Sequence, residues 1–320
     1  MRIGIVILPD ERWSVAGRRW QLAEQYGFDH AWTYDHLGWR DLVDGPWFDA
    51  VTTLTAAAMV TRRIRLGTYV ASPNFRHPVH FAREITALDD ISQGRLILGA
   101  GAGGPGFDAA VLGRPELSPR QRVDRFAEFL ELLDALLRGD RVSWSGSYFT
   151  AVDARSTPGP VQRPRPPLVV AANGPRTMRL AARFGDGWLT TGAAADASAG
   201  ASAGASAGAS AGAFAGASAG AFAGDEDGWW RSVAEARDRF AEAAAAAGRE
   251  PDEVDRYLDL DSSPVYSLSS PAAFTDAVGR AAELGFTDVL THWPRASSWY
   301  AGSEKVLESV AAMLPRLRGR

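Results

Sequence analysis

The residue best suited to proton transfer in this sequence is a histidine in a Thr33-Tyr34-Asp35-His36 segment, directly after a short apolar run. Histidine titrates near neutral pH, so His36 could give or take a proton, with Asp35 orienting its ring or balancing its charge. Trp39 follows and could line a substrate site. The alternative is that the backbone at the end of a strand satisfies the ring nitrogens of His36.

Two later segments carry groups that could hold a ligand. In residues 69–78, prolines flank polar and aromatic side chains, which favours a stiff loop. There Phe75 could cover a flat ring and Arg76 could neutralise an anion. Residues 99–106 are rich in glycine, which lets the backbone approach a ligand closely. This run lacks the Lys-Ser/Thr ending of a Walker loop, so it predicts no nucleotide triphosphate site.

A turn of small residues after the apolar run 168–172 predicts an anion site. A strand, a small-residue turn and a helix start leave free backbone amides and the positive helix end facing the ligand. The alternative is ordinary helix capping. The residues concerned are Ala172, Asn173, Gly174, Pro175, Arg176 and Thr177. After the last apolar run, His292 and Trp293 add a second histidine and an aromatic ring.

Eight short apolar runs alternate with helix-like segments along the chain. They span residues 3–8, 31–34, 64–70, 96–100, 168–172, 188–191, 257–260 and 289–292. Continuous apolar runs are typical of strands covered on both faces, and eight such units in about 250 residues favour a (β/α)8 TIM barrel over a doubly wound open sheet. In a barrel the carboxyl ends of the strands carry the active site, which is where the segments above lie.

The segments between the runs show helical periodicity. One apolar stripe comprises Phe126, Phe129, Leu130, Leu133, Leu136 and Leu137. Gly27, Gly94 and Gly185 stand where helices should stop, and glycine can take a positive φ there. The seventh strand is the least clear, because residues 256–261 carry three charges.

Composition excludes several classes of function. The net charge of −4 leaves no basic stripe for nucleic acid, and the absence of cysteine excludes disulfides and thiolate metal sites. The five histidines show no close metal-ligand spacing, so we expect no metal. No run is long enough to cross a membrane and the amino terminus lacks a signal-peptide pattern, so we expect a cytoplasmic protein.

One segment breaks the alternation. Residues 197–224 repeat a four-residue Ala-Ser-Ala-Gly or Ala-Phe-Ala-Gly unit seven times. This composition cannot bury enough apolar surface to offset its chain entropy. We expect one barrel domain over residues 1–320, with residues 193–227 as a flexible insert within it.

The glycine-lined space, the anion site, the aromatic residues and one histidine, without metal ligands or a nucleophile, suit a phosphorylated flat cofactor better than hydrolysis. In these features the sequence resembles the bacterial luciferase-like flavin and deazaflavin oxidoreductases. The matching motifs are Asp35-His36, Gly67-Thr68-Tyr69-Val70 with residues 73–76, Asp89-Asp90-Ile91-Ser92-Gln93-Gly94-Arg95, residues 98–103, Ala171-Ala172-Asn173-Gly174-Pro175 and residues 181–188. Together they cover nearly the whole chain apart from the repeat.

The resemblance implies a barrel that binds FMN or the deazaflavin coenzyme F420 and performs redox chemistry at its ring. It implies a cis peptide between Tyr69 and Val70, the catalytic pair Asp35 and His36 beside the ring, and the phosphate-bearing tail at residues 171–174. The cofactor would contact Tyr69, Val70, Ala71, Asn74, Gly101, Gly103, Ala172, Asn173, Gly174, Pro175, Arg176 and Thr177. The substrate would contact Trp39, Phe75, Arg76, Gly104, His292 and Trp293.

One departure from the family pattern concerns the substrate. The sugar-phosphate dehydrogenases of this family carry a glutamate where this chain has Gly104, so a dehydrogenase of that kind is not expected. The expected reaction is hydride transfer between F420 and a small organic substrate. The alternatives are an FMN-dependent monooxygenase served by a separate flavin reductase, a catalytically silent flavin-binding barrel, and a hydrolase or isomerase on the same fold. The expected partner is a small molecule, and a homodimer is compatible with the sequence.

Overall fold

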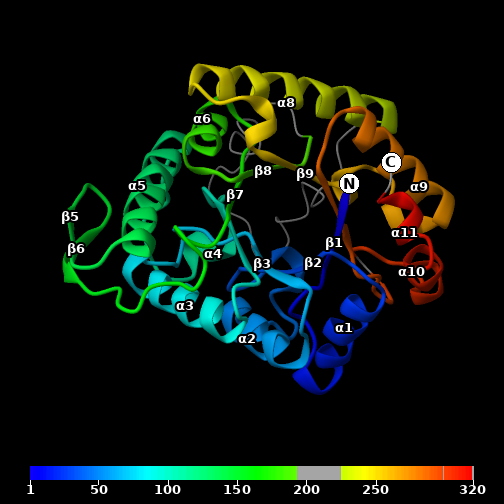
Figure 1. Cartoon of the computed structure of the whole chain (residues 1–320), viewed down its shortest axis with the longest axis horizontal. Helices are drawn as coiled ribbons and strands as arrows, with labels where there is room; N and C mark the ends of the chain where they lie inside the picture. The colour runs from blue at the N-terminus through cyan, green and yellow to red at the C-terminus, as the bar shows by residue number, and fades with distance from the viewer. Residues whose placement is uncertain (193–224, 298, 319–320) are drawn as a thin grey trace, which may run out of the picture.

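Parallel strands close into a barrel in the order β1-β10-β9-β8-β7-β4-β3-β2 (Figure 1). The computed structural model describes residues 1–192, 225–297 and 299–318. The barrel strands are β1 (Arg2–Val6), β2 (His30–Tyr34), β3 (Arg65–Tyr69), β4 (Leu96–Gly101), β7 (Leu168–Ala171), β8 (Gly187–Thr190), β9 (Asp255–Asp259) and β10 (Asp288–His292). Each strand overlaps one of the eight apolar runs. The predicted TIM barrel is therefore confirmed, and the open sheet is excluded by the closed ring.

The seventh barrel strand, β9, begins two residues before the predicted run, and its charges have partners at both ends. At the amino end Asp255 lies 2.6 Å from the Arg2 guanidinium. At the carboxyl end Asp259 is buried and accepts a hydrogen bond from the Tyr69 hydroxyl at 2.7 Å. Of the charges that made this strand hard to recognise, Asp259 ends the strand and Asp261 lies just past it, where a barrel can place polar groups.

Helices surround the barrel (Figure 1). The longer ones are α1 (Trp13–Gln25), α2 (Ala50–Val60), α3 (Pro78–Ile91), α5 (Pro119–Arg138), α6 (Pro175–Phe184), α8 (Glu226–Ala246), α9 (Pro271–Glu283) and α10 (Glu304–Ala311). Short helices are α4 (Phe107–Ala110) and α11 (Leu314–Leu317), with 3-10 turns η1 (Arg40–Leu42), η2 (Pro251–Glu253), η3 (Leu260–Ser262) and η4 (Ser267–Ser269). Among the helices that are described, none is both long enough and apolar enough to span a bilayer.

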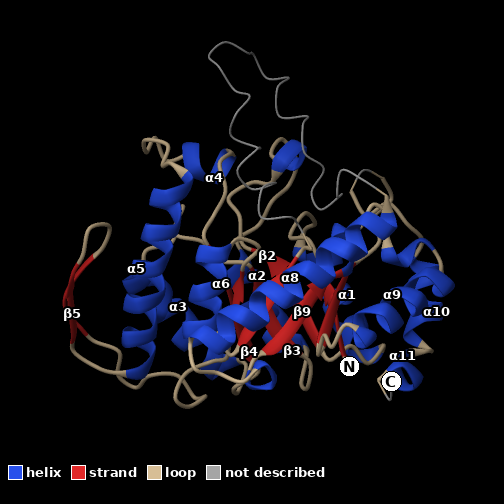
Figure 2. Cartoon of the chain, turned by 90° about the horizontal axis from the view of Figure 1, so that it is seen from above, coloured by secondary structure: helices blue, strands red, loops and turns tan. Residues whose placement is uncertain are grey.

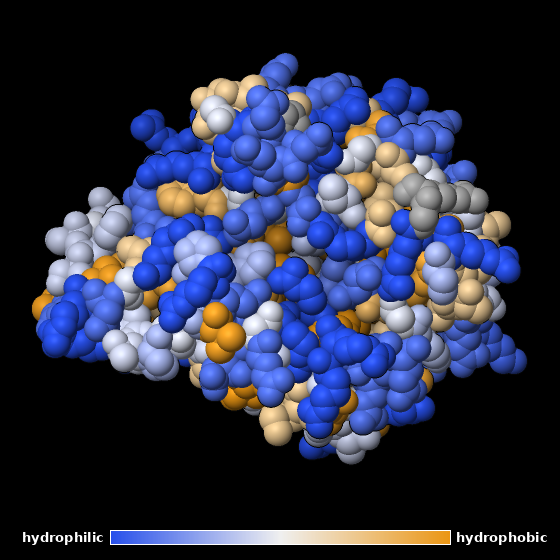
Figure 3. Space-filling view, viewed as in Figure 1, coloured by the Kyte–Doolittle hydropathy of each residue, from blue (hydrophilic) through white to orange (hydrophobic). Residues whose placement is uncertain are grey.

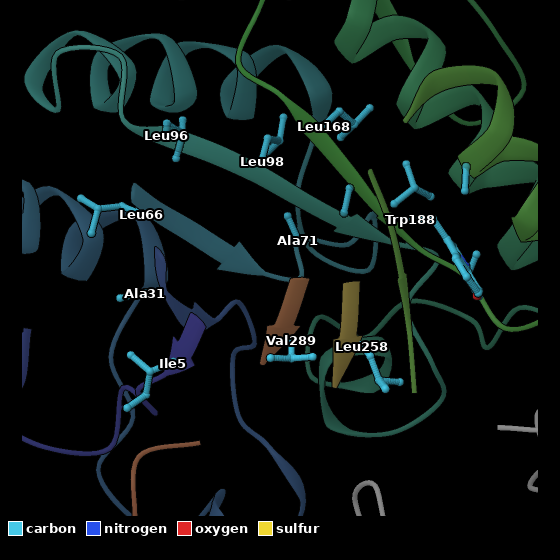
Figure 4. Close-up of a cluster of buried hydrophobic side chains, with 14 of the residues drawn as sticks. Ile5, Ala31, Leu66, Ala71, Leu96, Leu98, Leu168, Trp188, Leu258 and Val289 are labelled. Carbon is cyan, nitrogen blue, oxygen red and sulfur yellow. The ribbon is translucent and has the colours of Figure 1, made fainter. Parts of the chain in front are cut away.

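The hydrophobic core has two layers because successive strand residues point to opposite faces. Outward-facing residues such as Leu96, Leu98 and Leu168 lie on the sides of the strands that face the helices (Figure 4). Inward-facing residues such as Trp32 and Ile97 fill the barrel itself. All six residues of the stripe predicted for α5 are buried, which confirms that helix. Most of the surface seen in Figure 3 is hydrophilic, with small apolar patches between.

Glycines end helices in two different ways. Gly27 and Gly94 follow α1 and α3 with φ of +87° and +75°, in the left-handed region that favours glycine. Gly185 has a φ of −78°, so the expectation of a positive φ there is wrong. A Cβ at Gly185 would lie 2.7 Å from the Ala181 carbonyl oxygen, so close backbone approach requires this glycine instead.

One element was not predicted. Strands β5 (Val142–Ser145) and β6 (Thr150–Ala154) form a hairpin beside α5, at the edge of the molecule in Figure 2. The carboxylate of Glu128 on α5 accepts hydrogen bonds from the amides of Ser147, Tyr148 and Phe149 in its turn. The hairpin strands are not covered on both faces, so they lack the continuous apolar runs by which the barrel strands were predicted.

The predicted insert lies mainly outside the described residues, because residues 193–224 are not described. Its carboxyl-terminal boundary is corrected by the structure. Asp225 caps the amino terminus of α8, where its side chain accepts a hydrogen bond from the Gly228 amide at 2.7 Å. Residues 225–227 therefore belong to this helix and its cap rather than to the insert.

Candidate active site

The side chain of His36 forms an acid-base pair that the sequence did not predict. Its Nδ1 lies 2.5 Å from the Oδ2 of Asp108, a residue of α4 that follows β4. The Oδ1 of Asp108 accepts the Leu37 amide at 2.8 Å, which fixes the carboxylate. The Asp108 side chain is 7% exposed and that of His36 is 31% exposed. A titratable ring thus stands open to solvent at the carboxyl end of β2, backed by a buried carboxylate.

Asp35 has a different partner. Its carboxylate accepts hydrogen bonds from Nη2 and Nε of Arg76 at 2.6 and 3.1 Å. Burial raises the pKa of Asp35, and the hydrogen bonds from Arg76 oppose that rise. Asp49 and Glu84 also lie within 3.0 Å of the guanidinium. These contacts correct the expectation that Asp35 orients His36. They also correct the assignment of Arg76 to a substrate anion, because protein carboxylates already occupy the guanidinium.

Four predicted site residues meet around Tyr34, which was not among the predicted ones. The Tyr34 ring stacks on Tyr69 with centroids 5.4 Å apart and meets Trp39 edge-on at 5.0 Å. His36 and His292 lie 5.8 and 5.7 Å away. Tyr34 therefore sits between the two histidines at the mouth of the barrel. Tyr34 belongs to the segment that carries Asp35 and His36, but its sequence position alone assigned it no role.

His292 belongs to a second Asp-His pair. Its ring is fully buried, and its Nδ1 lies 3.0 Å from the Oδ2 of Asp261. On the other side, Nε2 lies 3.0 Å from the Tyr34 hydroxyl, which in turn lies 2.8 Å from the Tyr300 hydroxyl. The Tyr300 ring stacks on the imidazole with centroids 3.7 Å apart. His292 therefore contacts other protein groups rather than presenting its ring to a substrate.

The same region brings together three groups of the kind that bind metals. Asp259, Asp261 and His292 each place a ligand atom within 4.8 Å of the others. The sequence did not predict this grouping, because His292 is more than thirty residues away from the two aspartates in the chain. Asp259 Oδ2 accepts hydrogen bonds from Tyr69 and Ser262, while Asp261 Oδ2 accepts them from the amide and the ring of His292. These bonds satisfy the carboxylates, so we describe the group as a hydrogen-bond network.

Two predicted substrate contacts lie elsewhere. Trp293 is 2% exposed, stacks on Tyr26 at the end of α1, and donates its Nε1 hydrogen to Glu304 at 3.0 Å. Successive strand residues alternate in direction, so Trp293 packs outside the barrel while His292 points to its mouth. This corrects the assignment of Trp293. Phe75 lies half-buried under the Arg76 guanidinium, 4.9 Å from the ring centroid, and supports the ion pair with Asp35.

The strand order places the remaining predicted cofactor contacts along one arc. Strands β2, β3, β4, β7 and β8 are consecutive neighbours in the ring. Ala71 bridges to Ala100, and Gly101 is paired with Ala171. The peptide between Tyr69 and Val70 is cis, as the resemblance implies. A Cβ on Gly101 would lie 2.8 Å from a Val70 methyl, so glycine lets these two strand ends approach.

The loop after β4 is fixed by a buried amide. Asn74 is 4% exposed, donates to the Gly104 carbonyl at 3.0 Å and accepts from Arg125 at 2.5 Å. Gly103 has a φ of +72°, and a Cβ there would lie 2.7 Å from the Asn74 side chain. Gly104 has no atom within 4 Å of its Cβ position. Asn74 therefore shapes the turn, and Gly104 leaves space beside it.

The predicted anion site has an open helix terminus. Gly174 is the N-cap residue of α6, with no side-chain cap, and its Cβ position has Thr177 Oγ1 as nearest neighbour at 3.9 Å. Asn173 bonds Thr190 and Thr191 at 2.7 and 2.8 Å and so joins the turn to β8. Backbone amides of a helix start, with room beside a glycine, suit a phosphate group.

Two neighbours of that terminus do not face it. Arg176 reaches Asp124 on α5 at 2.5 Å, so its charge is directed away from the helix start. Ala172 is 4% exposed, and its carbonyl accepts a hydrogen bond from Trp188 Nε1 at 2.7 Å. The residues present fit a phosphate-bearing cofactor through the backbone of α6 rather than through a cationic side chain.

Curated relatives are similar to this chain over about half of its length. One is an F420-dependent glucose-6-phosphate dehydrogenase of Beutenbergia cavernae, 41% identical over 174 residues, which are 53% of this chain and 50% of the relative. Another is an F420-dependent hydroxymycolic acid dehydrogenase of Mycobacterium tuberculosis, 36% identical over 171 residues, which are 53% and 46% of the two chains. The chain thus spans about half the length of the curated relatives it matches.

Solved structures share the fold. The F420-dependent tetrahydromethanopterin reductase of Methanopyrus kandleri superposes with a TM-score of 0.71 at 20% identity, over 99% of both chains. The long-chain alkane monooxygenase LadA gives 0.72 at 15% identity, over 100% of this chain and 92% of its own. The sequence profile described as Luciferase-like monooxygenase matches residues 1–228. With that match over more than half of its residues, the chain belongs to the luciferase-like monooxygenase family.

Proposed function

We propose that this protein is an F420-dependent oxidoreductase that transfers hydride between the deazaflavin and a small organic substrate. The observation that carries the proposal is the 2.5 Å contact between His36 Nδ1 and Asp108 Oδ2 at the barrel mouth. A hydride transfer between a deazaflavin and a substrate leaves protons to be delivered or removed at both reacting partners. A partly exposed imidazole held by a buried carboxylate is suited to that task.

The arc of strand ends suggests where the cofactor lies. The phosphate-bearing tail would bind at the α6 amino terminus, through backbone amides beside Gly174. The ring would lie toward β3 and β2, near Val70 and His36. When bound, the deazaflavin supplies the hydride chemistry. The protein holds the cofactor, excludes water with the aromatic residues around Tyr34 and moves a proton at His36 Nε2.

The choice of F420 rests on the relatives and on the second strand. Both relatives reported above are described as F420-dependent. The Asp35-His36 motif resembles that of the deazaflavin branch, and its histidine pairs with the carboxylate of Asp108. Gly104 lies beside open space where sugar-phosphate dehydrogenases of the family carry a glutamate. We therefore infer a substrate other than a sugar phosphate.

The cofactor is tested by incubating the purified full chain with F420 and, separately, with FMN. After gel filtration, the absorption spectrum shows which chromophore has stayed with the protein. Retention of F420 supports the proposal. Exclusive retention of FMN, together with oxygen consumption in the presence of a flavin reductase, would support an FMN-dependent monooxygenase instead.

The role of the histidine is tested with His36→Asn, which keeps a similar size and hydrogen bonding but cannot titrate. We expect F420 to bind as before, while turnover falls by roughly a hundredfold or more, the usual contribution of a positioned acid or base. Equal losses of binding and turnover would make His36 a binding residue. Unchanged turnover would exclude it as the acid or base.

A further inference from the structure

A chain of hydrogen bonds leads from the fully buried His292 to the mouth of the barrel. The Tyr34 hydroxyl lies 3.0 Å from His292 Nε2 and 2.8 Å from the Tyr300 hydroxyl. Tyr34 is 4% exposed, and Tyr300 is half-buried. The imidazole has no direct path to water, so any proton that reaches or leaves Nε2 along these bonds must pass both phenols.

The inner end of this chain is fixed by Asp261. A carboxylate accepts hydrogen bonds only, so the nitrogen of His292 that faces it, Nδ1, carries a hydrogen. The same carboxylate accepts the His292 amide at 2.6 Å and, through Oδ1, the Ser267 amide at 2.9 Å, which prevents it from turning away. Nε2 is consequently the nitrogen that can gain or lose a proton, and it faces Tyr34.

We infer that Asp261, His292, Tyr34 and Tyr300 form a proton relay, with the Tyr300 phenol as the group that exchanges a proton with the substrate. This inference rests on the proposed function and deepens it. A reduced deazaflavin would give up a proton together with the hydride, and the substrate would gain one. The relay would serve the proton of the substrate, and His36 the proton of the cofactor. They meet at Tyr34, whose ring lies between the two imidazoles.

The relay conserves atoms and charge at each step. Hydride addition to a carbonyl or conjugated double bond leaves an anionic site on the substrate. The relay starts with a hydrogen on both ring nitrogens of His292, which is then an imidazolium cation. The Tyr300 hydroxyl gives its proton to the anionic site and takes the Tyr34 proton, while Tyr34 takes the proton from His292 Nε2. At the end both phenols are neutral again, His292 is neutral, and the substrate has gained one proton. Substrate oxidation runs the same steps in reverse.

The electrostatic setting keeps both phenols in the form that a relay needs. Burial raises the pKa of Tyr34 and of Tyr300, so each stays a neutral hydroxyl that donates one hydrogen bond and accepts another. The stacking of Tyr300 on His292 holds its hydroxyl in place. The neighbouring Tyr69 donates its hydroxyl hydrogen to the buried Asp259, whose Oδ1 lies 3.9 Å from Nδ1 of His292, so this bond does not reach Nε2.

The experiment measures proton exchange at His292 without any substrate. The full chain is labelled with 15N in histidine, and NMR gives the rate at which Nε2 exchanges its proton with water between about pH 5 and 9. We expect Tyr34→Phe to slow this exchange at least tenfold and Tyr300→Phe to slow it by a smaller factor. Each change removes a hydroxyl and keeps the ring that packs in the mouth.

Matched controls separate the relay from a general loosening of the mouth. Tyr266→Phe removes a hydroxyl of a half-buried residue that donates to the His292 carbonyl at 2.7 Å, and Tyr69→Phe removes the bond to Asp259. Neither should change Nε2 exchange. Equal rates in Tyr34→Phe and the parent protein, or an equal slowing in all variants, would overturn the relay, as would an Nε2 that never carries a proton in this range.

Two further outcomes separate this inference from the proposed function. His36→Asn should leave exchange at His292 unchanged while it lowers turnover, so a failure of the proposed function is seen in turnover alone. Metal analysis of the purified protein adds an independent check. One equivalent of a divalent cation that is lost in His292→Gln would assign Asp259, Asp261 and His292 to a metal site and overturn the relay.

Discussion

The imidazole Nδ1 of His36 lies 2.5 Å from the Oδ2 of Asp108, 72 positions further along the chain. Neither residue could hold this geometry alone. Strand β2 delivers the histidine, while the loop after β4 and the short helix α4 deliver the carboxylate. The carboxylate fixes which ring nitrogen faces the protein, so Nε2 is the nitrogen available for the proposed proton transfer.

The first prediction concerns that carboxylate. Asp108→Asn keeps the shape but removes the charge that stabilises a protonated His36, so turnover should fall by about tenfold or more while F420 binding is retained. The measurement is steady-state turnover beside a binding titration. Asp90→Asn, a change of the same kind at an exposed position, is the control. If the two variants are equally active, Asp108 has no part in the reaction.

The second prediction concerns the amino terminus of α6. Gly174→Val should weaken F420 binding by at least tenfold, because the branched side chain would fill the space where the phosphate approaches the amides. The nearest atom to the new Cβ is 3.9 Å away, so the fold should accept it with a loss of about 1 kcal/mol at the N-cap. Gly279→Ala, where nothing lies within 4 Å, is the control. Unchanged affinity would place the phosphate elsewhere.

The third prediction concerns the ion pair of Asp35 and Arg76. Arg76→Met leaves the buried Asp35 carboxylate without its cation, which should lower the free energy of unfolding by about 3–5 kcal/mol at neutral pH. Arg76→Lys, which keeps the positive charge, should lower the free energy of unfolding by less. Denaturant titration measures both.

The pH dependence of that loss follows from the pKa of Asp35. Burial already raises this pKa in the folded protein, and loss of Arg76 raises it further. A carboxyl group with a raised folded-state pKa becomes more favourable to folding as the pH falls through that value. The difference between Arg76→Met and the parent protein should therefore shrink on acidification. A constant difference down to pH about 4, the ordinary pKa of aspartate, would contradict a charge effect.

The fourth prediction concerns the closeness of β3 and β4. A Cβ at Gly99 would lie 2.0 Å from the Thr68 carbonyl oxygen, so neither strand can accommodate it without moving. Gly99→Ala should lower the free energy of unfolding by about 3 kcal/mol or more. Thermal unfolding measures this, with Gly279→Ala again as the control. A melting temperature equal to that of the parent protein would show that these strands can separate.

The sequence by itself determined the barrel and the position of its mouth. Each strand is a local apolar run and each helix, such as α5, has a local periodic stripe, so these elements are determined by residues close together in the chain. The motifs at residues 35–36, 99–106 and 173–177 lie at or just past the carboxyl ends of strands, and closure of parallel strands places all such ends on one face. The hairpin β5–β6 was missed because it lies outside that pattern.

Only the tertiary structure decided which side chains meet. Asp35 and His36 are neighbours in sequence, yet Asp35 binds Arg76 and His36 faces Asp108. His292 and Trp293 are also neighbours in sequence, yet His292 lies at the mouth of the barrel and Trp293 packs outside the barrel against Tyr26. Successive residues at a strand end point in different directions, and the partner of each is supplied by a strand or loop far away in the chain. Local spacing determines the elements, whereas the closure of the ring determines these pairs.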